Sequence, residues 1–265
     1  MKTDEISALI KKVADEEVAP RFRNLKEDEV IFKEPGEFVT TADLAAEFAL
    51  TRGLQELYPS AIVTGEEDIA KNPMRLVELL SADCGFLIDP IDGTNNYIKG
   101  NDRFAVMAVA LQFGKVAASW IYLPVFETLA VAEKGSGTFL NGEKCTLSPP
   151  ITKLCEMTGA AHINRMPEAH RAMAQKNLKI FKENRPAYCA GYDYVSLLTG
   201  KKDFSVYHRT LLWDHLPGTL LYSEAGGYVR TLDGGEYSSR NDGTGLLCAA
   251  NKDIWKGIKE TLFPS

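Results

Sequence analysis

Cysteine is scarce and widely spaced in this chain of 265 residues. No two cysteines have the C-x-x-C spacing of a thiolate metal site. Their odd number and wide separation also argue against a disulfide framework. They are Cys84, Cys145, Cys155, Cys189 and Cys248. Both features favour a reducing compartment, so we expect a cytoplasmic protein.

Long apolar runs and an excess of positive charge are also missing. No stretch approaches the roughly 20 apolar residues that span a bilayer. The opening residues, MKTDEISALIKKVADEEV, carry acids where a signal peptide would be apolar. The formal net charge is −6 at pH 7. We therefore expect no membrane partner and no direct nucleic-acid binding, which needs a basic surface.

Several motifs of phosphate binding and nucleophilic catalysis are absent too. The chain has no G-x-S-x-G elbow, no Walker P-loop and no G-x-G-x-x-G. These absences exclude a serine hydrolase of the elbow type and the common nucleotide-binding loops. Any hydrolytic chemistry must then come from another constellation of residues.

Acidic residues gather just after short apolar stretches or at expected helix starts, where α/β folds place ligands. They are Asp43, Glu66, Asp89, Asp92 and Asp214. Each has a structural explanation when taken singly. Asp43 fits a capping box with Thr40, TGEED could be a solvated loop, and Asp214 could cap a helix. Their combination in one chain favours a site.

The stretch LIDPIDGTNNY holds two of these acids on one expected turn. Asp89 and Asp92 lie three residues apart, with the Ile91 carbonyl between them. An EF-hand loop is excluded, because its twelfth position would be Gly100 rather than glutamate. Ligands that are all oxygen favour Mg²⁺, Mn²⁺ or Ca²⁺. Backbone N–H groups just after the turn could hold a phosphate. These belong to Gly93, Thr94 and Asn95.

The hydrophobic pattern predicts an α/β (α+β) protein with two domains. The N-terminal domain, residues 1–147, has helices near 4–18, 41–57 and 73–81, a buried strand ended by Pro90, and antiparallel strands over 104–139. A Pro-rich shift near 147–150 marks the expected boundary. The C-terminal domain, residues 148–265, alternates strands with helices near 167–184, 191–199, 214–225 and 251–262, which indicates an α/β domain.

Four motifs in order resemble the signatures of the inositol monophosphatase family. They are VTTAD followed by Glu47, then GEE, DPIDGTNNY and WDHLPGTLLYSEAGG. The family belongs to the Mg²⁺-dependent, lithium-sensitive sugar phosphatases, and the chain is most similar to its bacterial SuhB-like branch. The resemblance covers essentially the whole chain. It implies a layered αβαβα sandwich, as in fructose-1,6-bisphosphatase, often assembled as a homodimer.

The resemblance also implies roles for individual residues. Two ions would be held by Glu66, Asp89, the Ile91 carbonyl, Asp92 and Asp214, with Glu66 reaching a third through water. Asp43 and Thr94 would orient and help deprotonate the attacking water, and Glu66 would belong to the same catalytic group. Gly93, Thr94 and Asn95 would line the phosphate. The cofactor would be Mg²⁺, two or three ions, with Mn²⁺ as a substitute.

The chain departs from the family at the substrate end. A glutamate that contacts the inositol ring is replaced by Tyr207, followed by His208 and Arg209. Asp193 could supply an acid from another position, and Arg209 could meet a second phosphate. The resemblance therefore implies inositol-1-phosphatase activity first. Alternatives are hydrolysis of fructose 1,6-bisphosphate, 3′-phosphoadenosine 5′-phosphate or histidinol phosphate, and a catalytically idle regulatory homologue.

Overall fold

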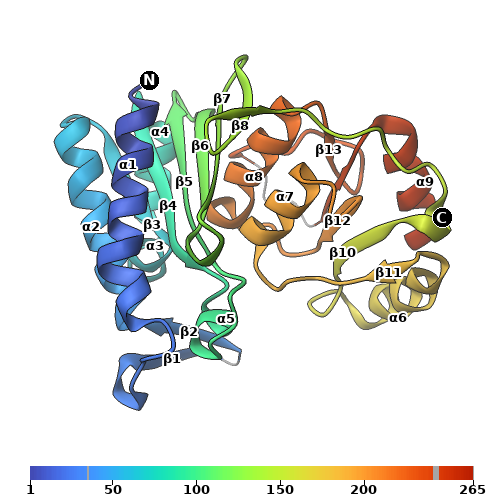
Figure 1. Cartoon of the computed structure of the whole chain (residues 1–265), viewed down its shortest axis with the longest axis horizontal. Coiled ribbons are helices and arrows are strands. Elements are labelled where there is room, and N and C mark those ends of the chain that lie inside the picture. The colour runs from blue at the N-terminus through green and yellow to red at the C-terminus, as the bar shows by residue number, and fades with distance from the viewer. Residues whose placement is uncertain (35, 241–244, 265) are drawn as a thin grey trace.

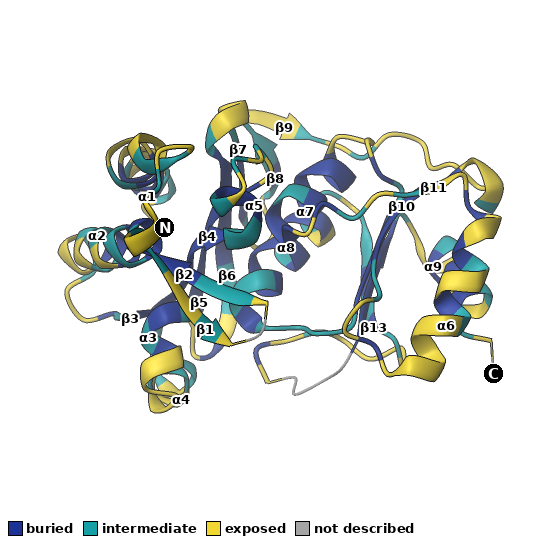
Figure 2. Cartoon of the chain, turned by 90° about the horizontal axis from the view of Figure 1, so that it is seen from below, coloured by how far each residue is buried: buried dark blue, intermediate teal, exposed yellow. Residues whose placement is uncertain are grey.

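The computed structural model describes residues 1–34, 36–240 and 245–264, which form five stacked layers (Figure 1). Two helices pack on a seven-stranded sheet, two more helices lie between this sheet and a five-stranded sheet, and a last pair covers the far side. Figure 2 shows the buried residues concentrated in the sheets and the central helices. The αβαβα sandwich expected from the resemblance is confirmed.

The seven-stranded sheet holds every strand between residues 62 and 145. Its order is β3 (Ile62–Gly65), β4 (Cys84–Asp92), β5 (Ala105–Gln112), β6 (Lys115–Leu123), β7 (Thr128–Glu133), β8 (Gly137–Leu140) and β9 (Glu143–Cys145). Strands β3 and β4 are parallel, and the remaining neighbours are antiparallel. The antiparallel strands expected over 104–139 are confirmed.

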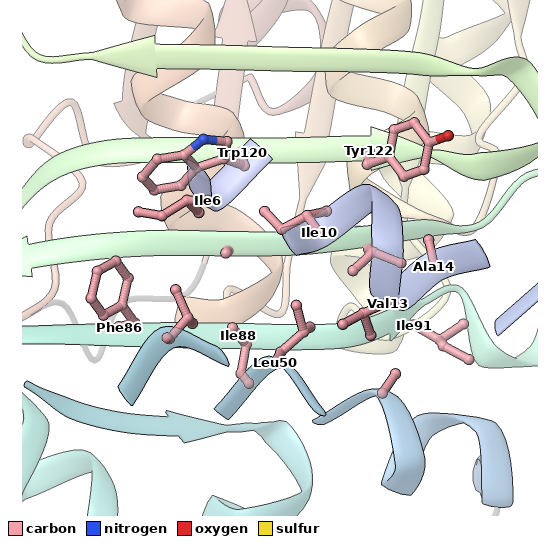
Figure 3. Close-up of a cluster of buried hydrophobic side chains, with 14 of the residues drawn as sticks. Ile6, Ile10, Val13, Ala14, Leu50, Phe86, Ile88, Ile91, Trp120 and Tyr122 are labelled. Carbon is pink, nitrogen blue, oxygen red and sulfur yellow. The ribbon is translucent and has the colours of Figure 1, made fainter. Parts of the chain in front are cut away.

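The first layer is formed by α1 (Thr3–Val13) and α2 (Thr41–Leu57). Apolar residues at helical spacing on α1 face the sheet, as Figure 3 shows for Ile6 and Ile10 beside Trp120. Each large side chain buried in this way contributes about 1.5–3 kcal/mol. The expected helix over 4–18 ends its α-helical portion at Val13 and continues as a π-helical turn through Val18.

The central layer consists of α7 (Ala190–Leu198) and α8 (Leu212–Glu224). They lie against each other and against the first sheet. Gly218 permits this close approach, because a Cβ atom there would lie 1.9 Å from the Tyr194 ring. The first turn of α8 carries Asp214 as its third residue rather than as its N-cap, which is Leu211. The central layer thus brings Asp214 to the first sheet.

The second sheet has the order β11 (Glu183–Asn184), β10 (Thr158–His162), β12 (Phe204–Tyr207), β14 (Leu246–Ala249) and β13 (Tyr228–Thr231). Helices α6 (Glu168–Asn177) and α9 (Lys252–Leu262) cover its outer face (Figure 1). The expected helix over 167–184 is shorter than predicted, because a 3₁₀ turn and β11 occupy its second half. The division into domains 1–147 and 148–265 stays a prediction.

Small elements complete the edge where the site lies. They are the hairpin of β1 (Val30–Glu34) and β2 (Glu37–Thr40), and the helices α3 (Glu66–Lys71), α4 (Met74–Ser81) and α5 (Thr94–Ile98). The stretch FKEPGEFVTTAD, whose proline and glycine predict a loop or a short hairpin, contains this hairpin, although Pro35 lies outside the described residues. The stretch AIVTGEED predicts a short strand that opens into a polar loop; the strand is confirmed, but the loop is wrong, since α3 begins at Glu66. Two of the N–H groups in its first turn, of Glu67 and Asp68, donate to the Glu47 carboxylate.

In the described residues of the chain, no helix is both long and apolar enough to cross a membrane.

Candidate active site

Asp89 and Asp92 lie at the C-terminal end of strand β4 in the first sheet. The strand does not end at Pro90 as predicted but continues to Asp92. The pairing with β5 shifts register between Asp89 and Asp92, so an irregular segment accommodates the proline. Asp89 is 1% exposed, and among the residues that the structure describes neither of its buried carboxylate oxygens has a hydrogen-bond partner. Two unpaired oxygens of this kind are the ligands that a hard cation requires.

Three carboxylates converge beside the end of β4. We call these three residues and Asp92 the inner end of the site. Glu66 at the start of α3, Asp89 and Asp214 on α8 each offer an oxygen, and these oxygens lie within 4.8 Å of one another. Asp92 is outside this closest group. Its Oδ2 accepts from the Cys189 thiol at 3.0 Å and from the Gly191 N–H at 2.6 Å. The residues fit a cation site that is neutral only when filled.

The electrostatics of the inner end agree with this fit. Burial raises the pKa of Asp89 well above its usual range, and the charges of Glu66 and Asp92 raise it further. Burial, followed by Asp92 and Glu66, does the same to the pKa of Asp214. Like charges so close together favour protonation unless a cation compensates them.

Lys33 of the hairpin supplies one compensating charge. Its Nζ lies 3.2 Å from Glu66 Oε1 and 2.5 Å from Glu67 Oε1. Burial lowers the pKa of Lys33, but the charge of Glu66 and the bond to Glu67 outweigh it, so that the pKa is raised. The motif analysis missed Lys33, because it lies 33 positions from Glu66 and in no signature.

The start of α5 lies directly after Asp92. Gly93 has φ +85°, a conformation that favours glycine, and a Cβ atom there would lie 3.0 Å from that of Cys189. The Thr94 hydroxyl lies 3.3 Å from Asp43 Oδ1 and 3.0 Å from the Ile91 carbonyl oxygen. The structure therefore brings together Asp43, Thr94 and the acidic turn.

Asp43 has a capping role in addition to its contact with Thr94. Its Oδ2 accepts from the Thr40 N–H at 2.8 Å, as the capping-box pattern predicts. Burial raises the pKa of Asp43 to about 7, against the lowering effect of the Thr40 hydrogen bonds. One oxygen thus fixes the carboxylate to the start of α2, and the other faces Thr94.

A cavity of about 330 Å³ opens over these residues. Its lining includes the inner end, Gly93, Thr94 and Asn95, and residues at or beyond the ends of strands of the second sheet. We call the latter the outer end: His162, Arg165, Tyr188, Tyr207 and Arg209. The ring of His162 stacks on Tyr207 with centroids 4.9 Å apart, and Tyr188 meets His162 edge-on at 5.8 Å. The outer end is an aromatic wall with two guanidinium groups.

Tyr207 and Arg209 therefore lie at the cavity, as the motif comparison expected, whereas Asp193 does not line it. Asp193 is fully buried and is surrounded by donors: Lys202 Nζ, His162 Nε2 at 2.6 Å and the Ala187 N–H at 3.2 Å. Its carboxylate supports His162 from behind instead of facing the cavity.

The outer end contains residues that the sequence analysis did not single out. His162 ends β10 opposite Tyr207, which ends β12, and these two strands are parallel. Arg165 follows three residues after His162. The rule that ligands lie beyond strand ends, applied to GAAHINR, would have found both. Tyr188 has φ 57° and is 57% exposed. No local sequence pattern predicts its place at the cavity.

The close carboxylates of Glu66, Asp89 and Asp214 form an acidic cluster that fits a hard cation. A model of the inositol monophosphatase family matches residues 2–263. The chain therefore belongs to the inositol monophosphatase family, as the resemblance indicated. By class it is a metal-dependent phosphoric monoester hydrolase.

Individual relatives agree with this membership. The chain is 28% identical over 240 residues to the inositol-1-monophosphatase of Mesorhizobium japonicum, a match that covers 89% of this chain and 87% of that protein. It is 27% identical over 228 residues to a putative Nus factor SuhB of Neisseria meningitidis serogroup B, covering 82% and 81%. The crystal structure of the extragenic suppressor protein SuhB from Bartonella henselae superposes with a TM-score of 0.79 at 26% identity, covering 97% of this chain and 99% of that chain.

Proposed function

We propose that the protein hydrolyses a small phosphorylated polyol or sugar with Mg²⁺ as cofactor. The observation that carries this proposal is the position of Asp89. One of its oxygens lies within 4.8 Å of an oxygen of Glu66 and of Asp214, and neither of its buried oxygens has a hydrogen-bond partner in the described part of the chain. Phosphate monoester hydrolysis needs acceleration of up to about 10²¹-fold, which positioning of a water and charge stabilisation together can supply.

We infer that Glu66, Asp89, Asp92, Asp214 and the Ile91 carbonyl hold two or three Mg²⁺ ions, with Mn²⁺ as a substitute. When bound, the ions activate water and stabilise the leaving oxygen. Because Asp92 Oδ2 already accepts two hydrogen bonds, its other oxygen is the ligand that we assign to the ions. The Gly191 N–H and the Cys189 thiol fix that orientation.

Asp43 and Thr94 are proposed to prepare the attacking water. The Thr94 hydroxyl has one proton, which it shares between Asp43 and Ile91, so its lone pairs can accept from a water. A proton taken up by this pair ends on Asp43, whose pKa of about 7 suits a general base near neutral pH. The N–H groups of Gly93, Thr94 and Asn95 are proposed to line the phosphate.

Inositol 1-phosphate is the substrate that we propose first, supported by the name of the Mesorhizobium relative. Fructose 1,6-bisphosphate, 3′-phosphoadenosine 5′-phosphate and histidinol phosphate are the alternatives, and Arg209 at the cavity supports the first two. A cytoplasmic homodimer inhibited by lithium is further proposed from the family resemblance. A regulatory role forms the second candidate, favoured by the Nus factor name of the Neisseria relative.

A kinetic panel tests the enzymatic proposal. It measures phosphate release from these four substrates by the wild type and by Asp214→Asn, with and without Mg²⁺. We expect Mg²⁺-dependent turnover that Asp214→Asn lowers by at least about a thousandfold, because a ligand oxygen and its charge are lost. Asp253→Asn on the exposed face of α9 is the matched control and should retain full activity. If the wild type is inactive on the whole panel, the phosphatase proposal is rejected and the regulatory role is the candidate that stays.

A further inference from the structure

Two arginines of the outer end converge on one oxygen of the hairpin. Arg165 Nη2 lies 2.9 Å from Glu37 Oε1, and Arg209 Nη1 forms an ion pair with the same atom. Glu37 begins β2, whereas Arg165 follows β10 and Arg209 follows β12. All three residues line the cavity. Segments far apart in the sequence therefore meet at a point of concentrated positive charge.

Two guanidinium groups held close together repel each other, and negative charge between them offsets this repulsion. One carboxylate offsets only one of the two charges. Each guanidinium has five N–H donors in a planar fork, and Arg165 and Arg209 remain 52% and 36% exposed. Donors therefore remain for a phosphate or carboxylate, which such forks bind in bidentate fashion.

We propose that the outer end binds a second anionic group on the leaving group of the substrate, and that Glu37 occupies that position in the free protein. This inference rests on the proposed phosphatase function. Glu37 and Arg165 are then specificity-determining residues. A substrate with one phosphate and a neutral polyol leaves the ion pairs to Glu37 intact. A substrate with a second anionic group replaces Glu37 between the arginines.

The hairpin is anchored independently of Glu37, so the carboxylate can be displaced without releasing the whole segment. Lys33 of β1 is bound to Glu66 and Glu67, and the Asn95 amide donates to the Gly36 carbonyl at 2.9 Å. Displacement then costs the ion pairs with Glu37 alone. A phosphate or carboxylate of the substrate restores these pairs with its own charge.

Substrate pairs that differ only in the second anion test the inference in the Mg²⁺-loaded full chain. The first pair is 2-phosphoglycerate and glycerol 2-phosphate, in which the second anion is a carboxylate. The other pair is fructose 1,6-bisphosphate and fructose 1-phosphate, in which it is a phosphate. The readout is the kcat/KM of the compound with two anionic groups divided by the kcat/KM of the compound with one, for each pair.

In the wild type we expect this ratio to exceed one for at least one pair, and the pair identifies the anion. Arg165→Gln should lower the ratio by about tenfold, because hydrogen bonds to a charged group are lost. Glu37→Gln should raise it about fivefold, because the competing carboxylate is gone. Arg185→Gln is the matched control, since Arg185 pairs with Glu183 and does not line the cavity. It should leave the ratio unchanged.

The opposite results overturn the inference. If Arg165→Gln leaves both ratios unchanged, the arginines serve no second anion. If Glu37→Gln lowers the ratios, Glu37 is a structural tie between the hairpin and the second sheet. The failure of the phosphatase proposal looks different, because the wild type with Mg²⁺ would then release no phosphate from any of the four compounds or from inositol 1-phosphate.

Discussion

The two ends of the cavity are built in different ways. The inner end collects carboxylates beside the end of β4, and no described residue forms a hydrogen bond with the oxygens of Asp89. The outer end pairs its charges: Arg165 and Arg209 with Glu37, and His162 with Asp193. The inner end requires a cation to become neutral, whereas the outer end keeps one guanidinium charge beyond the charge of Glu37. Chemistry is therefore assigned to the first and selection of the substrate to the second.

The inner end should be the region of the cavity that binding of Mg²⁺ stabilises most. The test measures the melting temperature of the wild type and of Asp89→Asn with and without Mg²⁺. We expect Mg²⁺ to raise the melting temperature of the wild type only, because bound ligand stabilises the folded state. Without Mg²⁺, Asp89→Asn should melt higher than the wild type, since a buried carboxylate without partners is removed. Lower stability of the metal-free variant would contradict this account.

The outer end should depend on the buried ion pair behind it. Lys202 is 7% exposed and forms the ion pair with the fully buried Asp193. Lys202→Met should lower the free energy of unfolding by ~3 kcal/mol, because a buried charge loses its partner. Lys201→Met is the matched control, since Lys201 is exposed, and should cost little. Chemical denaturation measures both. If the two substitutions cost the same free energy of unfolding, the buried ion pair of Lys202 with Asp193 does not stabilise the protein more than an exposed lysine does.

A smaller effect is expected at His215, between the two ends. Burial lowers the pKa of His215 to about 3, although a hydrogen bond to the Arg209 carbonyl opposes the shift. Between pH 3 and 6.5 the unfolded chain binds the extra proton, so this contribution to stability is complete above pH 6.5 and falls with acidification. His215→Gln should therefore reduce the loss of stability between pH 7 and 5 by ~2 kcal/mol.

Urea denaturation at both pH values checks this prediction. His170→Gln on the exposed face of α6 is the control and should keep the wild-type pH dependence. If both variants keep that dependence, His215 is not the group that titrates on unfolding.

Much of the fold followed from hydrophobic periodicity. The helix over Thr41–Leu57 was predicted with its bounds, since Thr40 caps its start and Tyr58-Pro59 ends its pattern. The prediction that the strand ends at Pro90 and the prediction of a polar loop at Glu66 were wrong, because tertiary contacts outweighed the local signals. Pairing with β5 carries β4 past its proline, and the Glu47 carboxylate caps α3 from 20 positions away.

The sequence by itself determined the acidic turn of the inner end, because one short motif carries its residues and the local backbone places them, whereas the tertiary structure brings Glu66 and Asp214 to this turn. Asp89, Ile91, Asp92 and Thr94 lie within six consecutive positions. Only the tertiary structure decided the outer end. Glu37 and Arg209 are 172 positions apart, and their contact exists because the hairpin of the first half reaches the strand ends of the second. No local pattern encodes such a contact, so the sequence left the substrate open where the structure points to a second anion.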